Sequence, residues 1–188
     1  SVFLATMSHE LRTPLNGIIG STQLLGHSQL TEWQQRQTER LLHSATVLRS
    51  LINDILDLSK IEAGRLHLDT TAFDLHDLLK RTVDGFVARA AAKGVTMALD
   101  TGEMPARRYI GDPLRIEQVL NNLLGNALKF TDAGSVTLKF GCTMTNSDLH
   151  VISIDVADTG IGMDSQQQAG LFAPFYQAES SIYRRFGG

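Results

Sequence analysis

Apolar positions recur with a helical period along the first third of the chain. From residue 1 to about residue 26 they are separated by alternating steps of three and four residues, which is the spacing of helices that pack on other helices. This apolar seam, imperfect at its proline and serine, consists of Leu4, Met7, Leu11, Pro14, Ile18, Ser21 and Leu25. The seam predicts one long helix, which Gly26-His27-Ser28 ends.

A second long helix is predicted from Thr31 and Glu32 to about Ala63-Gly64. Its apolar positions again alternate steps of four and three: Leu41, Ala45, Leu48, Ile52, Ile55 and Ser59. Two long helices with a short connection predict an antiparallel hairpin. Because two helices alone bury little surface, we expect a second copy to complete a four-helix bundle, which makes the protein a homodimer.

The pattern changes near residue 65, where we place a boundary between domains 1–65 and 66–188. Helices are predicted at 74–93, closed by Gly94, and at 112–130, opened by the N-cap and proline of Asp112-Pro113. Short strands are predicted at 66–68, 95–99, 136–142 and 152–156. Beyond Gly160 the sequence is loop-like. The second domain is therefore expected to be a layered α/β domain.

Composition limits the classes of protein to which the chain can belong. The 188 residues are 43% apolar and 20% charged, as in globular proteins, and the net charge of −3 argues against a nucleic-acid partner. The single cysteine, Cys142, excludes an intrachain disulfide and fits a reducing compartment. No apolar run approaches the roughly 20 residues of a membrane span, so we expect a cytoplasmic location. Both ends of the chain look cut.

One histidine stands out on the first helix. At 100° per residue, His9 lies about 170° from the centre of the apolar seam, with Thr13 on the same outward face and Glu10 one step round. Such a histidine is usually only solvated. However, Pro14 interrupts the helix just after it at a cost of about 3 kcal/mol, and a sequence seldom retains such a defect without a use.

The segment Phe3 to Asn16, FLATMSHELRTPLN, resembles the phosphoacceptor motif of sensor histidine kinases of two-component systems. The resemblance implies that His9 is phosphorylated and that Thr13 holds the water that dephosphorylates a partner. A neutral imidazole, with an ordinary pKa of about 6.5, is a competent nucleophile near neutral pH. Attack through one ring nitrogen requires the other to lose or share its proton. Glu10 is placed to accept that proton as general base, or to orient the ring.

The helix at 112–130 carries a polar face, whose members fall within about 80° of one another: Arg115, Gln118, Asn122, Asn126 and Lys129. Amide oxygens suit Mg²⁺, and a lysine suits phosphate. A strand then ends at Asp158, which strand parity places on the core side with Val156, and a buried carboxylate needs a partner. Alone, each feature has a plain structural explanation: a solvated helix face or a tight turn.

Together these segments resemble the ATP domain of histidine kinases, whose fold is shared with gyrase, the ninety-kilodalton heat-shock chaperone and mismatch-repair ATPases. Residues 122–131, 158–163 and 171–177 resemble its asparagine, first glycine and phenylalanine boxes, in the family's order. The resemblance implies an α/β sandwich that binds ATP. It assigns Mg²⁺ to Asn126 and phosphate to Lys129. Asn122 stands where gyrase-like relatives have a catalytic glutamate.

The resemblance also assigns the residues that bind the adenine and those that form a lid. Asp158 accepts a hydrogen bond from the adenine amino group, and the nucleotide site includes Phe130 and the glycine-box residues Gly160, Ile161 and Gly162. Residues 164–188 form a lid, in which Phe175 and Tyr176 pack and either Arg184 or Arg185 reaches the γ-phosphate. The family continues with a second glycine box, so the ATP domain is expected to be incomplete at its C-terminal end.

The implied function is ATP-dependent autophosphorylation of His9 and transfer to an aspartate of a response-regulator receiver domain, with phosphatase activity as a further possibility. The receiver is expected to dock around His9, with Ile18 and Ile19 as candidate contacts, although Ile18 fits the bundle core better. The alternatives are a non-catalytic dimeric scaffold with a degenerate ATP domain and a gyrase-type ATPase. The intact His9 and Asp158 argue against the first, and Asn122 argues against the second.

Overall fold

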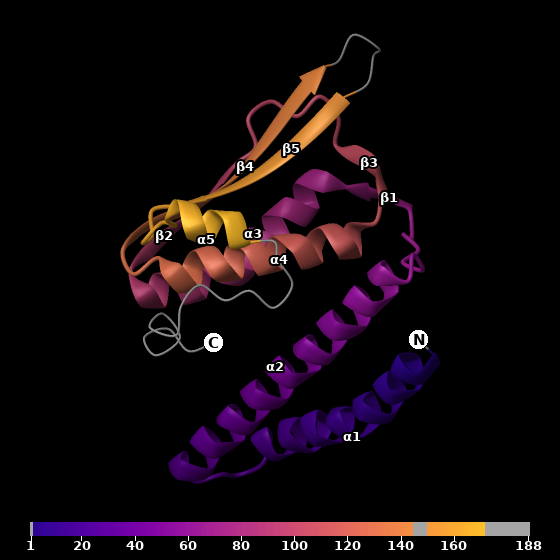
Figure 1. Cartoon of the computed structure of the whole chain (residues 1–188). Helices are drawn as coiled ribbons and strands as arrows, with labels where there is room; N and C mark the ends of the chain where they lie inside the picture. The colour runs from indigo at the N-terminus through magenta and orange to yellow at the C-terminus, as the bar shows by residue number, and fades with distance from the viewer. Residues whose placement is uncertain (1, 145–149, 172–188) are drawn as a thin grey trace. The chain divides into compact units, whose positions relative to one another are not determined.

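The computed structural model describes residues 2–144 and 150–171, with side chains for 10–143 and 151–171. Contacts divide the chain into two compact units, Ser1–His67 and Leu68–Gly188 (Figure 1). The expected order, a helical hairpin followed by an α/β unit, is confirmed. Within the described residues, no helix combines the length and the apolar character that a membrane crossing needs.

The hairpin consists of α1 (Val2–Gly26) and α2 (Glu32–Glu62), so both predicted helices are confirmed. A capping box begins α2: the Gln34 amide donates to the Thr31 hydroxyl at 3.3 Å, and the Thr31 amide donates to the Gln34 side chain at 2.9 Å. This reciprocal pair satisfies two backbone donors that an unprotected helix start would leave open.

The contact inside the hairpin uses Ala45 and Ile52 of the predicted positions on α2 but none of the described seam residues on α1. Leu15, Ile19 and Ala45 are buried, and Leu42 and Ile52 pack against them. By contrast, the described leucines and isoleucine of the seam stay exposed: Leu11 46%, Ile18 51% and Leu25 52%.

This arrangement corrects one expectation: Ile19, expected as a docking contact, is buried at 6% exposure. Ile18, expected in the core of a dimeric bundle, is 51% exposed within one chain, as a residue covered only by a second copy would be. The physical reason is that the stripe through Leu15 and Ile19 lies one residue further along α1 than the seam positions. This stripe faces α2, so the seam lies on a side of α1 that α2 does not cover.

The second unit contains three helices and five strands within the described residues (Figure 1). These are β1 (Thr71–Asp74), α3 (Leu75–Lys93), β2 (Val95–Asp100), β3 (Arg108–Gly111), α4 (Pro113–Phe130), β4 (Gly134–Met144), β5 (His150–Asp158) and α5 (Ser165–Gly170). The predicted strand at 66–68 is wrong, because the chain instead pairs β1 with β3 in an antiparallel ribbon. α5 falls in sequence expected to be loop, although Asp164 and Gln167 form a capping box that marks its start.

The main sheet has the order β2-β4-β5, with β2 parallel to β4 and β5 antiparallel to it. α3 packs on β2 and on α4, and α4 packs on β4 and β5, so both long helices cover one face of the sheet (Figure 1). The helices and the sheet enclose one continuous core, whose most completely buried aliphatic side chains are Leu78, Leu79, Leu124, Val136 and Leu138. This core holds α4 and the end of β5 in place, and both carry the predicted nucleotide residues.

Candidate functional site

The start of α4 is fixed by Asp112. Its carboxylate accepts hydrogen bonds from the backbone amides of Arg115, at 3.1 Å, and Asp69, at 3.0 Å, and Pro113 occupies the first helical turn. These amide hydrogen bonds, that of Arg115 above all, hold the pKa of Asp112 below its usual 3.8. The N-cap thereby sets where α4 begins, and with it which side chains face the core.

The two asparagines lie on the exposed side of α4, opposite the buried Leu120, Leu124 and Ala127. The side-chain NH₂ of Asn126 donates to the side-chain oxygen of Asn122 at 3.4 Å, one helical turn away. The carbonyl oxygen of Asn126 takes no part in this contact. Amide oxygens are ligands that Mg²⁺ accepts, so the donor set fits the metal that the sequence implies.

A cation lies at the C-terminal end of the same helix. The Lys129 ammonium lies 5.4 Å from the centre of the Phe130 ring, and both residues are half-buried. The long, flexible stem of lysine can redirect this ammonium toward an anion without moving the helix. Lys129 therefore fits a phosphate-binding role, although in this structure its charge rests on an aromatic ring.

Asp158 closes β5. It pairs with Val136, which is fully buried, so its side chain starts from the core face of the sheet, as predicted. The side chain itself is exposed and not buried, which corrects the expectation of a buried carboxylate. The reason is its position: β5 ends here, opposite the start of β4, so the core does not extend over it. One of its oxygens, Oδ1, accepts the Gly160 amide at 2.9 Å.

The segment Asp158–Met163, called here the glycine loop, joins the end of α4. The Ile161 amide donates to the Phe130 carbonyl at 3.3 Å. A Cβ on Gly160 would collide with that same carbonyl, so the glycine is needed for this close approach of the loop to α4. Gly162 has φ 68° and open space around its Cα, which fits the predicted role of leaving room for a ligand.

Thr159 anchors the other side of the glycine loop, a role that sequence reasoning missed. Its amide donates to the Ser135 carbonyl at 3.1 Å, and its hydroxyl accepts the Ser135 amide at 3.0 Å. A threonine in a turn gives no distinctive pattern, so nothing in the sequence marked it. With both anchors, the loop is held between β4 and α4.

The structure thus brings the polar face of α4 and the glycine loop together at Phe130. Asn122, Asn126 and Lys129 come from the helix, and Asp158 to Gly162 come from the loop. Phe175, Tyr176, Arg184 and Arg185 lie outside the described residues.

In the hairpin, His9 is part of α1, and its side chain lies outside the described part of the chain. Glu10 and Thr13 are exposed on the same helix. The Arg12 guanidinium donates to the Asn53 side chain at 3.3 Å, which ties this turn of α1 to α2. The described neighbours of His9 therefore offer a carboxylate and a hydroxyl on an anchored helix.

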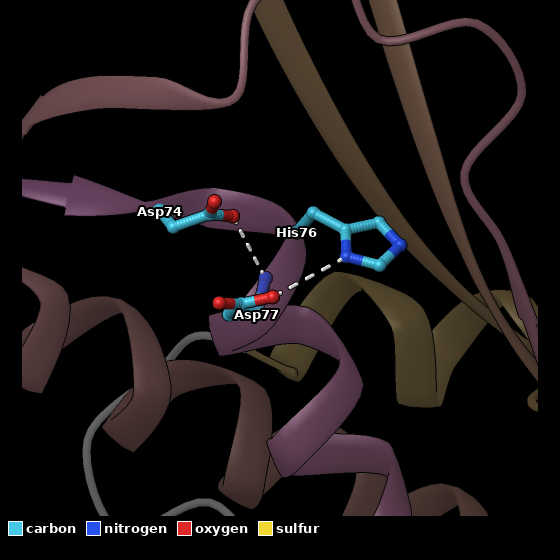
Figure 2. A group of neighbouring side chains, drawn as sticks. All are labelled: Asp74, His76 and Asp77. Atoms are coloured by element: carbon cyan, nitrogen blue, oxygen red, sulfur yellow. Dashed lines mark hydrogen bonds and ion pairs between the residues drawn. The ribbon is translucent and has the colours of Figure 1, made fainter.

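A second cluster of titratable groups, Asp74, His76 and Asp77, lies at the start of α3 (Figure 2). Asp74 is the N-cap and accepts the Asp77 amide at 3.0 Å, while the His76 ring nitrogen lies 3.6 Å from the Asp77 carboxylate. The hydrogen bond from Asp77 and then the charge of Arg107 lower the pKa of Asp74. Because Arg107 lies 3.4 Å from Asp74 and 3.5 Å from Asp77, both carboxylates already have a cation, and the cluster is a helix cap.

Comparisons with known proteins agree with both units. Residues 1–64 match the His Kinase A (phospho-acceptor) domain, and residues 111–188 match the histidine kinase-, DNA gyrase B- and HSP90-like ATPase domain. The chain therefore belongs to the sensor histidine kinases, as its motifs indicated.

Among individual relatives, the signal transduction histidine-protein kinase BarA of Escherichia coli K12 is 42% identical over all of this chain. The sensor histidine kinase GacS of Pseudomonas protegens is 43% identical over the same length. The chain spans only 20% of either protein. The structure of full-length ShkA in complex with AMPPNP superimposes with a TM-score of 0.75 at 34% identity, covering 96% of this chain and 38% of ShkA.

Proposed function

We propose that this chain is the catalytic core of a sensor histidine kinase, in which the second unit binds ATP and its γ-phosphoryl group is transferred to His9. The observation that carries the proposal is the hydrogen bond between Ile161 and Phe130, which joins the polar face of α4 to the loop that begins at Asp158. A phosphate-binding face and a base-binding carboxylate thereby belong to one site. ShkA, which shares the fold, holds the ATP analogue AMPPNP.

Each residue of the site has a distinct role in this proposal. Asp158 accepts a hydrogen bond from the adenine amino group with the oxygen that Gly160 does not occupy. Asn126 offers its carbonyl oxygen to Mg²⁺, which when bound neutralises phosphate charge. Lys129 pairs with phosphate, and Ile161 and Gly162 border the nucleotide. Asn122 is an amide and not a carboxylate, so it cannot act as a base on water, which favours transfer over hydrolysis.

On the hairpin, a ring nitrogen of His9 is the nucleophile. A P–N bond forms to the γ-phosphorus while the bond from that phosphorus to the β–γ bridging oxygen breaks, and ADP leaves. The proton on the other ring nitrogen is shared with or taken by Glu10. The γ-phosphoryl group must reach His9 for this step, and residues 64–68, the part of the connection that precedes the hydrogen bond of the Asp69 amide to Asp112, supply the hinge.

The test incubates the full-length protein with γ-labelled ATP and Mg²⁺ and measures both phosphate on protein and phosphate in solution. We expect acid-labile, alkali-stable label that is absent in His9→Gln, while ATP binding in that variant is unchanged. Released phosphate without labelled protein would favour the gyrase-type ATPase, and the absence of any turnover would favour the scaffold.

We also propose two partners. The first is a second copy of the chain, packed on the exposed seam of Leu11, Ile18 and Leu25. The second is a response-regulator receiver domain, whose aspartate takes the phosphoryl group from His9. Because Ile19 is buried and Ile18 belongs to the seam, the receiver would dock on the face of α1 that carries Glu10 and Thr13.

A phosphatase reaction on that receiver is favoured by Thr13, an exposed hydroxyl one helical turn after His9. We propose that it orients the attacking water. Thr13→Ala is expected to retain autophosphorylation and to slow the loss of label from the phosphorylated receiver, both followed on the same gel. An equal fall in the two rates would remove this assignment.

A further inference from the structure

Lys93 is the last residue of α3, yet its ammonium is directed at the end of α4. It donates to the carbonyls of Leu128 at 2.8 Å, Lys129 at 3.4 Å and Thr131 at 3.1 Å. It also lies 3.8 Å from the Asp132 carboxylate. An ammonium has three hydrogens, so these carbonyls use its full donor capacity.

α4 depends on this external donor because of how it ends. The last carbonyls of a helix have no partner inside the helix, and many helices solve this with a left-handed glycine. α3 ends in that way at Gly94, with φ 73°. α4 instead ends at Thr131 in an extended conformation, with φ −105°. The Lys93 charge therefore satisfies these carbonyls and complements the negative end of the α4 dipole.

The carbonyl that Lys93 does not take is that of Phe130, and this one accepts the Ile161 amide of the glycine loop. Of the four backbone carbonyls of residues 128–131, three therefore accept from the Lys93 ammonium and one accepts from the Ile161 amide. Gly160 lies against the same Phe130 carbonyl and donates its amide to Asp158. An unbroken series of contacts runs from Lys93 through the end of α4 to Asp158.

We propose that Lys93 is a positioning residue of the nucleotide site: by holding the carbonyls at the end of α4, it fixes the Phe130 carbonyl and so the glycine loop that presents Asp158 to the adenine. This inference rests on the proposed function, because it needs ATP to bind at Asp158. Among the described residues, the Lys93 ammonium reaches only backbone carbonyls at the end of α4, that of Lys129 included, and the Asp132 carboxylate; it contacts no side chain of the polar face and no atom of the glycine loop. Its effect should fall on nucleotide affinity and not on the transfer step.

The variants are Lys93→Met, which removes the donors and the charge, and Lys93→Arg, which retains both. The matched control is Lys80→Met, on the same helix, where the ammonium pairs only with Asp84 at 2.7 Å. Three quantities are measured on the full-length protein: the dissociation constant for ATP, the rate of His9 labelling at saturating ATP, and hydrogen exchange of the Ile161 amide.

For Lys93→Met we expect about a tenfold weaker affinity for ATP and about tenfold faster exchange at Ile161, since charged hydrogen bonds are lost. The labelling rate at saturating ATP should stay within about twofold, and Lys93→Arg should restore both losses. If Lys93→Met does not fold, Lys93→Gln replaces it and must show the same division between affinity and rate.

Wild-type affinity in Lys93→Met, unchanged exchange at Ile161, or the same losses in Lys80→Met would each overturn the proposal while leaving the kinase function intact. Failure of the wild-type protein to bind ATP would instead overturn the proposed function itself. The two failures are therefore distinguishable in one experiment.

Discussion

The hairpin and the α/β unit bury their apolar residues in different ways. The α/β unit encloses a continuous core of side chains from α3, α4 and the sheet, several of them fully buried. Among its described side chains, the hairpin buries only Leu15, Ile19, Ala45 and the polar Thr22 within one chain. The described apolar residues of the α1 seam remain exposed, so their pattern fits an interface that one chain cannot make.

The difference matters for function. A unit with its own core can hold a precise site, and the proposed nucleotide residues lie on such a scaffold of α4 and β5. A hairpin with an open seam can display an imidazole and gain stability from a second copy. We therefore expect core substitutions to act on the α/β unit alone and seam substitutions to act on association.

The largest expected effect on stability comes from Leu138→Ala, at the fully buried centre of β4. Loss of the side chain and the cavity left behind should lower the free energy of unfolding of the α/β unit by about 3 kcal/mol. Urea denaturation followed by circular dichroism measures it. Association of the hairpins should be unchanged, and a parallel loss of association would break the separation of the two units.

The next effect is on association and compares two exposed apolar positions of α1. Ile18→Asp places a charge on the seam and should raise the dissociation constant of the dimer about a hundredfold. Leu24→Asp is the matched control, because Leu24 is 74% exposed and lies off the seam. Sedimentation equilibrium gives both constants. Equal effects of the two variants would show that the seam is not the interface.

A smaller effect concerns pH and only the α/β unit. The pKa of Asp112 is lowered on folding, so its contribution to stability is present above the ordinary value of 3.8 and is lost as pH falls through the folded pKa. Asp112→Asn keeps an oxygen that can cap α4 but cannot titrate. We expect the variant to lose less stability than the wild type as pH is lowered from about 5 to well below 3.8, measured by urea midpoints. Identical pH profiles would contradict this cause.

The smallest effect separates two buried threonines of the α/β core. The Thr82 hydroxyl donates to the Leu78 carbonyl at 2.8 Å, whereas the Thr131 hydroxyl has no hydrogen-bond partner within the described residues. Without nucleotide, Thr82→Val should destabilise by about 1 kcal/mol, and Thr131→Val should be neutral or slightly stabilising. Thermal unfolding compares them. A greater loss at Thr131 than at Thr82 would show that its hydroxyl contributes to the fold.

Periodicity and capping residues predicted the long elements well. The caps at Thr31, Asp112 and Gly94 act over two to four residues, so the sequence alone contains the interactions that fix them. The β1–β3 ribbon was missed because it pairs residues far apart in the chain. The seam was predicted as apolar, but the intrachain stripe of Leu15 and Ile19 beside it was not, because period alone does not say which neighbour covers which helix face.

The candidate site shows the same limit. The residue types on α4 and in the glycine loop could be predicted, because they form compact motifs. The hydrogen bond that joins the glycine loop to the Phe130 carbonyl could not be predicted, and neither could the contacts of Lys93 with the same turn. Both involve backbone groups, which every residue carries, so no residue type marks them in the sequence. The exposure of Asp158 was missed because strand parity gives the face of a residue and not where the core ends.

The central claim is that adenine is recognised by the Asp158 carboxylate, and calorimetric titration tests it most directly. ATP and ITP, whose base carries an oxygen in place of the amino group, are titrated into the full-length wild-type protein and into Asp158→Asn. The account predicts that the wild type binds ATP at least about tenfold more tightly than ITP and that the variant loses this preference. An Asp158→Asn protein that binds ATP with wild-type affinity and preference would contradict it.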